Sequence, residues 1–218
     1  MTESMREKIY NKIRRDIITG KLSPGERLVE IKLSEELQAS RGLIREALLQ
    51  LSSEGFLTSQ KNKGISVAKL TLKQIDEIFS LRSILEAYAV RLATERFKND
   101  NFKQLTKMQN SLIKATKVGS LADWTDVNIA FHKFFISHSE NSYLIQMLDA
   151  LRCRTYRYSI FIITIPGAQE TFIQDHEEII KACKSGNADA AQHFMQKHME
   201  NAKNALLNHL KEFPGLVS

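Results

Sequence analysis

In this chain of 218 residues, four candidate ligands for a divalent metal ion are Asn128, His132, His176 and His198. Asn128 and His132 are four residues apart, so at about 100° per residue they project side by side from one helix. The surrounding segment is rich in aromatic residues, which predicts that this helical face points into a core. His176 and His198 fall in two further helical segments. Three imidazoles on three helices of a bundle, with an amide beside one, can bind a metal, although spacing alone does not bring the helices together.

The other three histidines do not share these faces. At about 100° per residue, His138 is rotated by about 240° from His132, and His193 by about 140° from His198. His209 lies about three turns beyond His198 on the same expected helix. We therefore expect these three histidines to be surface or packing residues.

A charged pair lies in the first long helical segment of the C-terminal part. Arg82 is on the apolar face of this segment, and Glu86 follows one turn later. Long charged side chains are rarely buried without a partner. Two interpretations are open: a buried ion pair, or a contact between Arg82 and an anionic effector. Arg152 and Thr155 are further candidates for effector contacts, and the cationic groups favour a small carboxylate.

Two arginines at the start of an expected helix over residues 41–53 could read DNA. Ser40 can cap this helix through its hydroxyl. Arg41, Gly42 and Arg45 lie outside the apolar face of the helix, which is formed by Ile44, Ala47, Leu48 and Leu51. An arginine near the start of a helix in the major groove can pair with guanine through two hydrogen bonds. The alternative is that both arginines are solvated surface residues.

The elements around this helix form a winged helix-turn-helix pattern. A first helix is expected over residues 5–19 and a second over residues 30–38, whose candidate core positions are Ile31, Leu33 and Leu37. Residues 56–59 and 65–70 are expected to form two strands. They are joined by a basic tip that includes Lys61 and Lys63.

Beyond this pattern the chain is a series of helical segments with short breaks. We place the boundary between Leu70 and Thr71, because Thr71 can cap the next helix. This gives a domain over residues 1–70 and a second over residues 71–218. The fold class is mainly α, with an all-α bundle as the second domain. Six helices are expected there, over residues 71–97, 99–118, 120–138, 141–164, 168–185 and 187–212.

The charge distribution is compatible with DNA binding. The formal net charge is +6, and residues 1–70 carry 13 Lys and Arg against 9 Asp and Glu. A composition of 43% hydrophobic residues excludes global disorder. Because the chain has neither an apolar run of about 20 residues nor an apolar N-terminal stretch, we expect a cytoplasmic protein without membrane contact. Cys153 and Cys183 lack the spacing of a thiolate metal site, and we expect both thiols to be buried.

The run from Ile9 to Leu70 resembles the N-terminal domain of GntR-family bacterial transcription regulators. The shared motifs are I-x-x-x-I-x-x-x-I-x-x-G, PGERL, SR-x-x-[VI]-REAL, L-x-x-EG and a wing ending in G-x-x-V. The resemblance implies a homodimer on a palindromic operator. It implies DNA contacts by Arg27, Ser40, Arg41, Gly42, Arg45 and Gly64, with Lys61 and Lys63 at the wing. The sequence departs from the family at Gln38, where a turn glycine is usual, and at Gly42-Leu43, where Thr-Pro is usual.

Residues 71–212 resemble the FCD ligand-binding domain of the FadR subfamily. The shared motifs are R-x-x-[IL]-E from Arg82 to Glu86, the segment ending at His132, DHEEII around His176 and a final histidine at His198. In metal-binding members, an aspartate and three histidines hold the ion at the floor of the effector pocket. Here Asn128 replaces the aspartate, which removes a negative charge and leaves a weaker carbonyl ligand. Zn or Ni is expected because the ligands are rich in imidazole.

The sequence thus predicts a bacterial transcription regulator, a repressor whose operator affinity changes when a small molecule enters the helical domain. One alternative is a metal-sensing repressor in which the ion itself is the signal. Another is a metal-dependent enzyme, since three histidines with an open position could activate water. A general base is missing for that reaction, because Asp175 and Glu177 flank His176 and are expected to point away from its ligand. We therefore expect no enzymatic activity.

Overall fold

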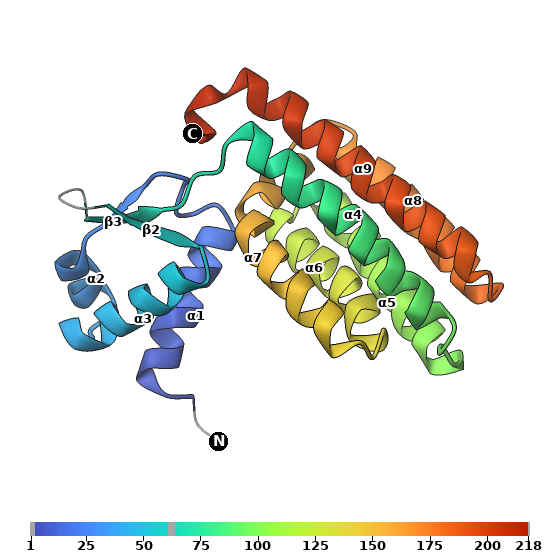
Figure 1. Ribbon diagram of the computed structural model, residues 1–218, viewed down its shortest axis with the longest axis horizontal. Helices are drawn as coiled ribbons and strands as arrows, with labels where there is room; N and C mark the ends of the chain where they lie inside the picture. The colour runs from blue at the N-terminus through green and yellow to red at the C-terminus, as the bar shows by residue number, and fades with distance from the viewer. Residues whose placement is uncertain (1–2, 61–63, 218) are drawn as a thin grey trace.

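The computed structural model describes residues 3–60 and 64–217, which form an N-terminal winged helix-turn-helix domain and a C-terminal bundle (Figure 1). The expected mainly α fold is confirmed. No helix within these two ranges is long and apolar enough to cross a membrane. Lys61 and Lys63 lie outside the described residues.

The N-terminal domain packs its helices against a small sheet. Its elements are α1 (Met5–Ile18), β1 (Arg27–Leu28), α2 (Glu30–Glu36), α3 (Arg41–Ser53), β2 (Leu57–Gln60) and β3 (Gly64–Val67). Ser4 caps helix α1: its hydroxyl accepts from the backbone N–H of Glu7, while the Glu7 carboxylate accepts from the backbone N–H of Ser4. The buried Ile9, Ile13 and Ile17 of α1 pack with the inward face of α3.

Two features of this domain differ from the expectation. Strand β1 was not expected; it pairs antiparallel with β3, which gives the strand order β1-β3-β2. Ile31 is 52% exposed, so its assignment to the core is wrong. Leu33 and Leu37 are half-buried against the core. Ile31 is rotated by about 200° from Leu33 around the helix, and one short helix buries only one face.

The turn between α2 and α3 has an unusual backbone. Gln38 occupies the position of the usual turn glycine and has a φ of 49°. This left-handed conformation is costly for a side chain that is not glycine. The helix-turn-helix geometry therefore persists without the glycine, at the expense of some local strain.

The C-terminal domain is a bundle of helices. Within the described residues its elements are α4 (Leu72–Thr94), α5 (Asn99–Val118), α6 (Leu121–His138), α7 (Ser142–Ile163), α8 (Ala168–Lys184), α9 (Ala188–Glu212) and a terminal 3-10 turn (Pro214–Leu216). These six long helices agree with the six expected from the sequence. Thr71 caps α4 reciprocally with Gln74.

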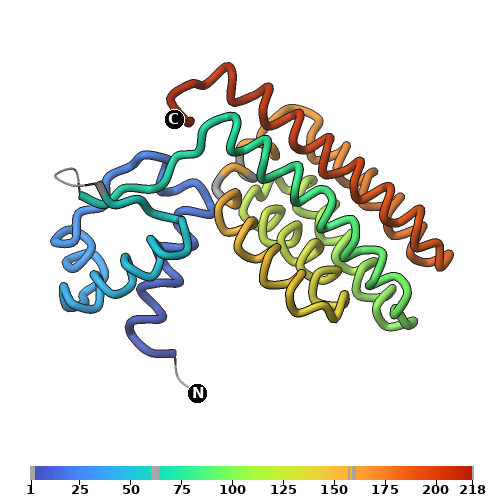
Figure 2. Tube along the Cα trace, in the orientation of Figure 1, coloured from blue at the N-terminus to red at the C-terminus, as the bar shows by residue number. Residues whose placement is uncertain are grey.

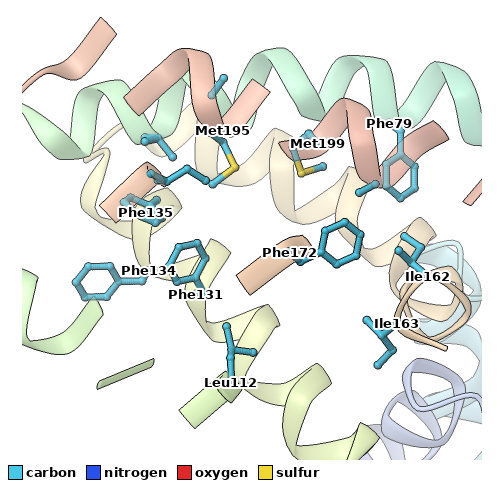
Figure 3. Close-up of a cluster of buried hydrophobic side chains, with 14 of the residues drawn as sticks. Phe79, Leu112, Phe131, Phe134, Phe135, Ile162, Ile163, Phe172, Met195 and Met199 are labelled. Atoms are coloured by element: carbon cyan, nitrogen blue, oxygen red, sulfur yellow. The ribbon is translucent and has the colours of Figure 1, made fainter. Parts of the chain in front are cut away.

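The core of the bundle surrounds the three candidate histidines. Figure 3 shows Phe131 and Phe135 from α6, Phe172 from α8 and the two methionines Met195 and Met199 from α9 in one apolar cluster. The Phe131 ring is stacked on the His176 ring, with their centroids 4.0 Å apart. This packing fixes the positions of α6, α8 and α9 relative to one another.

The two domains share a packed interface in which α7 contacts α1 (Figure 2). Tyr156 of α7 is buried within the core of the N-terminal domain, together with Phe56. The Arg14 guanidinium of α1 lies over both rings, 5.5 Å from the Phe56 centroid and 5.8 Å from that of Tyr156. Cys183 is buried, whereas Cys153 of α7 is only half-buried, so the expectation of two buried thiols is wrong for Cys153.

Candidate functional site

His132, His176 and His198 converge inside the bundle from α6, α8 and α9. One nitrogen from each ring lies within 4.8 Å of the corresponding nitrogens of the other two, and all three side chains are buried. The closest pair is the Nε2 atoms of His176 and His198, which are 3.3 Å apart. The structure therefore supplies the proximity that sequence spacing could not provide.

Carboxylates outside the cluster orient two of the three rings. His132 Nδ1–H donates to Glu86 Oε2 over 2.7 Å, and His198 Nδ1–H donates to Asp175 Oδ2 over 3.2 Å. These bonds fix the tautomers in which both Nε2 atoms carry the lone pair that can bind an ion, and that of His198 accepts from His176 Nε2–H. Asp175 reaches across from α8 to His198 Nδ1 on α9, a contact that sequence reasoning did not predict.

Burial favours the neutral form of His132 and of His176, which is the form that binds a metal. It lowers the pKa of His132 to about 4, against the opposing effect of the Glu86 carboxylate. It also lowers the pKa of His176 well below the ordinary value, and the neighbouring His198 and His132 add to this shift.

Asn128 provides a possible oxygen ligand beside the histidines. Its Oδ1 atom is buried and has no hydrogen-bond partner among the residues that the structure describes. Buried polar oxygens are rarely left without a partner. Asn128 lines a cavity together with His132 and His198, so an ion there would satisfy this oxygen. The residues present therefore fit a divalent metal.

A buried charge network adjoins the histidines. Glu86 accepts from Arg82 Nε over 2.9 Å and from Arg152 Nη1 over 2.9 Å, and Arg82 Nη1 donates to the Thr155 hydroxyl over 3.0 Å. Burial alone would raise the pKa of Glu86, but the two guanidinium groups hold it well below its usual range. Two cations thus face one carboxylate, which leaves one positive charge unbalanced in the network.

The cavity itself is small. It measures about 40 Å³, and its lining is mostly apolar apart from Arg82, Asn128, His132 and His198. The ion pair between Arg82 and Glu86 is present, and Arg82 also faces the cavity. Glu86, Arg152 and Thr155 do not line the cavity, and neither does His176. The two interpretations of Arg82 are thus compatible in one structure.

The network extends from the cavity to the N-terminal domain. Arg152 Nε donates to the Tyr156 hydroxyl over 3.2 Å, while its Nη1 donates to Glu86. Tyr156 in turn lies in the N-terminal core. A continuous series of contacts therefore runs from His132 through Glu86 and Arg152 to Tyr156. Sequence reasoning missed Tyr156, although its position one turn after Arg152 on a helix was available as a signal.

The candidate DNA-binding residues lie on α3 and the wing. Arg41, Gly42 and Arg45 are exposed on α3, and the Ser40 hydroxyl caps this helix by accepting from the backbone N–H of Leu43. Sequence reasoning also missed Glu30 of α2, which forms two hydrogen bonds with the Arg45 guanidinium.

The base of the wing brings Arg27 and Gly64 together. Gly64 has a φ of 78°, and a Cβ atom there would lie 3.4 Å from the Arg27 guanidinium. The backbone conformation favours glycine at this position, whereas the distance to Arg27 is an ordinary contact that a Cβ atom could make. Arg27 on β1 is exposed, so it lies beside the wing with its charge accessible.

Comparison with known proteins gives matches to both parts of the chain. The family model described as "Bacterial regulatory proteins, gntR family" matches residues 5–67, and that described as "FCD domain" matches residues 77–201. The chain is 29% identical to the Bacillus subtilis HTH-type transcriptional regulator YdhC, over 93% of this chain and 91% of that protein. It is 22% identical to the Escherichia coli HTH-type transcriptional repressor RspR, over 91% and 87%.

A solved structure of a relative has the same overall fold. The structure of Escherichia coli McbR/YncC superimposes on this chain with a TM-score of 0.84 at 25% sequence identity. The match covers 95% of this chain and 99% of the McbR/YncC chain.

Proposed function

Because this chain belongs to the GntR family of bacterial transcription regulators and carries an FCD domain, we propose that it is a ligand-controlled repressor. It binds a palindromic operator as a homodimer, and a small carboxylate bound beside a metal in the C-terminal domain changes its DNA affinity. DNA binding and regulation of transcription follow from the family, whose members are regulators and not enzymes. Repression is supported by the relative RspR, which is named a repressor.

The convergence of His132, His176 and His198 is the observation that carries the metal part of the proposal. These three histidines would bind the ion through nitrogen, and Asn128 Oδ1 would add an oxygen ligand. Zn or Ni suits a site rich in imidazole. When bound, the ion would supply a Lewis acid that attracts a carboxylate oxygen.

The unbalanced charge of the network supports an anionic effector. Arg82 and Arg152 together carry two positive charges against one on Glu86. A divalent ion would add two further positive charges. Buried charge without compensation is costly, so an anion at Arg82 and the ion would be favoured. The cavity of about 40 Å³ limits such an anion to a few atoms unless the helices move apart.

The contacts from His132 to Tyr156 support control of DNA binding by this site. An anion that attracts Arg82 or the ion would weaken the hydrogen bond between Arg82 and Glu86, and would thereby change the contact between Glu86 and Arg152. Arg152 is bonded to Tyr156, which packs in the N-terminal core beside Phe56. A ligand can shift an equilibrium only through contacts that differ between two states, and this interface provides such contacts.

An exposed apolar face on α4 and α7 supports the homodimer. Its five large side chains are 43% to 79% exposed, and they are Leu81, Ile84, Tyr88, Tyr143 and Met147. The two helices contact each other, so these side chains can form one surface. Exposed apolar patches of this kind are typical of interfaces between proteins. A second copy docked there would bring two winged domains to two operator half-sites.

For the DNA contacts we propose base or groove contacts by Arg27, Arg41, Arg45 and Gly64. Lys61 and Lys63 would neutralise phosphates at the wing. Ser40 and Gly42 would lie at the phosphates and bases around the start of α3. The exposure of Arg41, Gly42 and Arg45 on the same short stretch of α3 supports this arrangement.

The experiment that tests the proposal begins with a library of random DNA duplexes, from which the full-length protein selects its preferred sequence. The affinity for the selected duplex is then measured by titration with Zn or Ni alone, and again with a panel of small carboxylates. A change that requires both metal and a carboxylate supports effector control. A full response to metal alone supports the metal-sensing alternative, and failure to select any sequence contradicts the proposal.

A further inference from the structure

Arg45 on the exposed face of α3 is held by a carboxylate from the neighbouring helix. Its Nε lies 3.2 Å from Glu30 Oε1 and its Nη2 lies 2.9 Å from Glu30 Oε2. The Glu30 side chain is 23% exposed and that of Arg45 is 60% exposed. Among the residues that the structure describes, neither Arg27 nor Arg41 forms an ion pair. Arg45 is thus the one of these three arginines with a fixed partner.

The pairing occupies one particular edge of the guanidinium group. An arginine has five N–H donors, and the Nε and Nη2 donors that point the same way are those that Glu30 accepts. The edge formed by Nη1 and the second Nη2 hydrogen stays available. That edge is a pair of parallel donors, which is the geometry that the O6 and N7 acceptors of guanine require.

We propose that Glu30 is a positioning residue for DNA recognition, which holds Arg45 so that its terminal edge faces a guanine. This inference rests on the proposed DNA-binding function. Glu30 acts in two ways. It restricts the rotamers of a long side chain before binding, which reduces the entropy that is lost on the operator. Its negative charge also repels phosphates, so it lowers affinity for DNA in which no guanine meets Arg45.

The position of Glu30 within the charge pattern agrees with this role. The nearby Arg41 contributes to lowering the pKa of the Glu30 carboxyl, although the hydrogen bonds from Arg45 contribute most. Glu30 therefore lies beside both arginines at the start of α3 but bonds only one of them. No ion pair of Arg41 is recorded in the described part of the chain, so we assign the fixed base contact to Arg45.

The test uses full-length protein and the duplex that the wild type selects from a random library. The change is Glu30→Gln, and the matched control is Glu35→Gln, which removes the same charge from the same helix. Glu35 is exposed, and no ion pair of this residue is recorded in the described part of the chain. The measured quantity is the ratio of affinities for the selected duplex and for a scrambled one, together with the base preference at each position.

We expect Glu30→Gln to lower the affinity ratio by about two- to tenfold, as for the release of one immobilised side chain. The loss should be confined to the base pair whose preference also disappears in Arg45→Ala, and Glu35→Gln should keep that preference. In the Arg45→Ala background, Glu30→Gln should have no further effect on the ratio. If Glu30 only stabilised the fold, its replacement would not change the preference at a single base pair. Thermal unfolding of Glu30→Gln would reveal such a loss of stability.

Two results would overturn the inference. One is an unchanged base preference in Glu30→Gln. The other is an equal loss with and without Arg45, since Glu30 would then act through something else. Selection of no sequence by the wild type would overturn this inference and the proposed function together, whereas selection followed by either of the first two results would overturn the inference alone.

Discussion

Arg152 and Tyr156 join the buried charge network beside the histidines to the N-terminal domain. Arg152 Nε donates to the Tyr156 hydroxyl over 3.2 Å, one turn further along α7, while its Nη1 donates to the buried Glu86. The Tyr156 ring lies in the N-terminal core, so one side chain of the C-terminal bundle is part of the packing of the other domain. Under the proposed function, a ligand signal would pass through this contact.

The first prediction is that Tyr156→Phe uncouples the two domains. The ring and its packing remain, and only the hydrogen bond to Arg152 is removed. DNA affinity without ligand should stay close to the wild-type value. The change in affinity caused by metal and carboxylate should shrink by about 0.5–2 kcal/mol of coupling free energy.

The measurement is DNA titration with and without ligand, and metal affinity should be unchanged. Tyr10→Phe is the control, because it removes a tyrosine hydroxyl from the N-terminal core whose partner is Glu54 and not Arg152. Full retention of the ligand response in Tyr156→Phe would exclude this route.

The second prediction concerns an asymmetry in the charge network. Glu86→Gln leaves Arg82 and Arg152 buried without an anion, and we expect it to lower the free energy of unfolding by about 3–5 kcal/mol. Arg82→Met should cost distinctly less, because Glu86 keeps Arg152 and the network becomes neutral. Denaturant unfolding of both variants without ligand checks this order. The reverse order would show that the excess positive charge is compensated in some other way.

Much of the fold was predictable because the periodicities are local. The expected helix over residues 99–118 agrees with α5, and that over residues 41–53 agrees with α3. β1 could not be predicted, since a two-residue strand carries no alternation and exists only through its pairing with β3. Ile31 was assigned to the core because its type is apolar, but the packing of α2 on α3 buries the opposite face.

The candidate metal site was predictable in its residues but not in its surroundings. Histidines on segments with an apolar face could be selected by angle, and family resemblance supplied their proximity. The contact of Asp175 was missed because Asp175 and His176 are adjacent on one helix, so their side chains point in different directions. It acts on a histidine of another helix, and contacts between helices depend on packing that no spacing encodes. The same reason applies to Glu30, whose partner Arg45 is 15 residues away.

The third prediction concerns the pH dependence of stability without metal. Burial lowers the pKa of His132 to about 4, whereas an unfolded histidine titrates near 6.5. Above about pH 6.5 neither state binds the proton. Between about 6.5 and 4 only the unfolded state does, so the contribution of His132 to the free energy of unfolding falls as pH falls, by about 3 kcal/mol. Below about 4 this histidine contributes no further loss.

Denaturant unfolding between pH 7 and 4.5 with a chelator measures this slope. His193→Gln is the control and should keep the wild-type slope, since His193 lies outside the three-histidine cluster. His132→Gln should flatten the slope. An identical slope in all three proteins would contradict the assignment to His132.

The fourth prediction concerns metal retention. Replacing His132, His176 or His198 by Ala should abolish retention of Zn or Ni through gel filtration, because each ring offers one of the clustered nitrogens. His209→Ala should have no effect. Asn128→Asp should tighten binding by at least about tenfold, since a carboxylate replaces a neutral amide oxygen at a cation. Elemental analysis of the eluted protein gives the metal content, and absence of metal from both wild type and Asn128→Asp would identify the cluster as a direct effector site.

The last prediction concerns assembly through the face on α4 and α7. Ile84 is 58% exposed at the middle of the apolar residues of α4, so Ile84→Asp places a charge in the proposed interface. Burying an unpaired carboxylate there costs several kcal/mol, and we expect the dimer to dissociate at micromolar concentration. Val118→Asp is the control, because Val118 is 66% exposed on α5 and lies outside this face. Light scattering gives the mass in solution. If the Ile84→Asp protein dissociates, it should also lose most of its affinity for an operator with two half-sites. The interface would lie elsewhere if Ile84→Asp stayed dimeric or if Val118→Asp became monomeric.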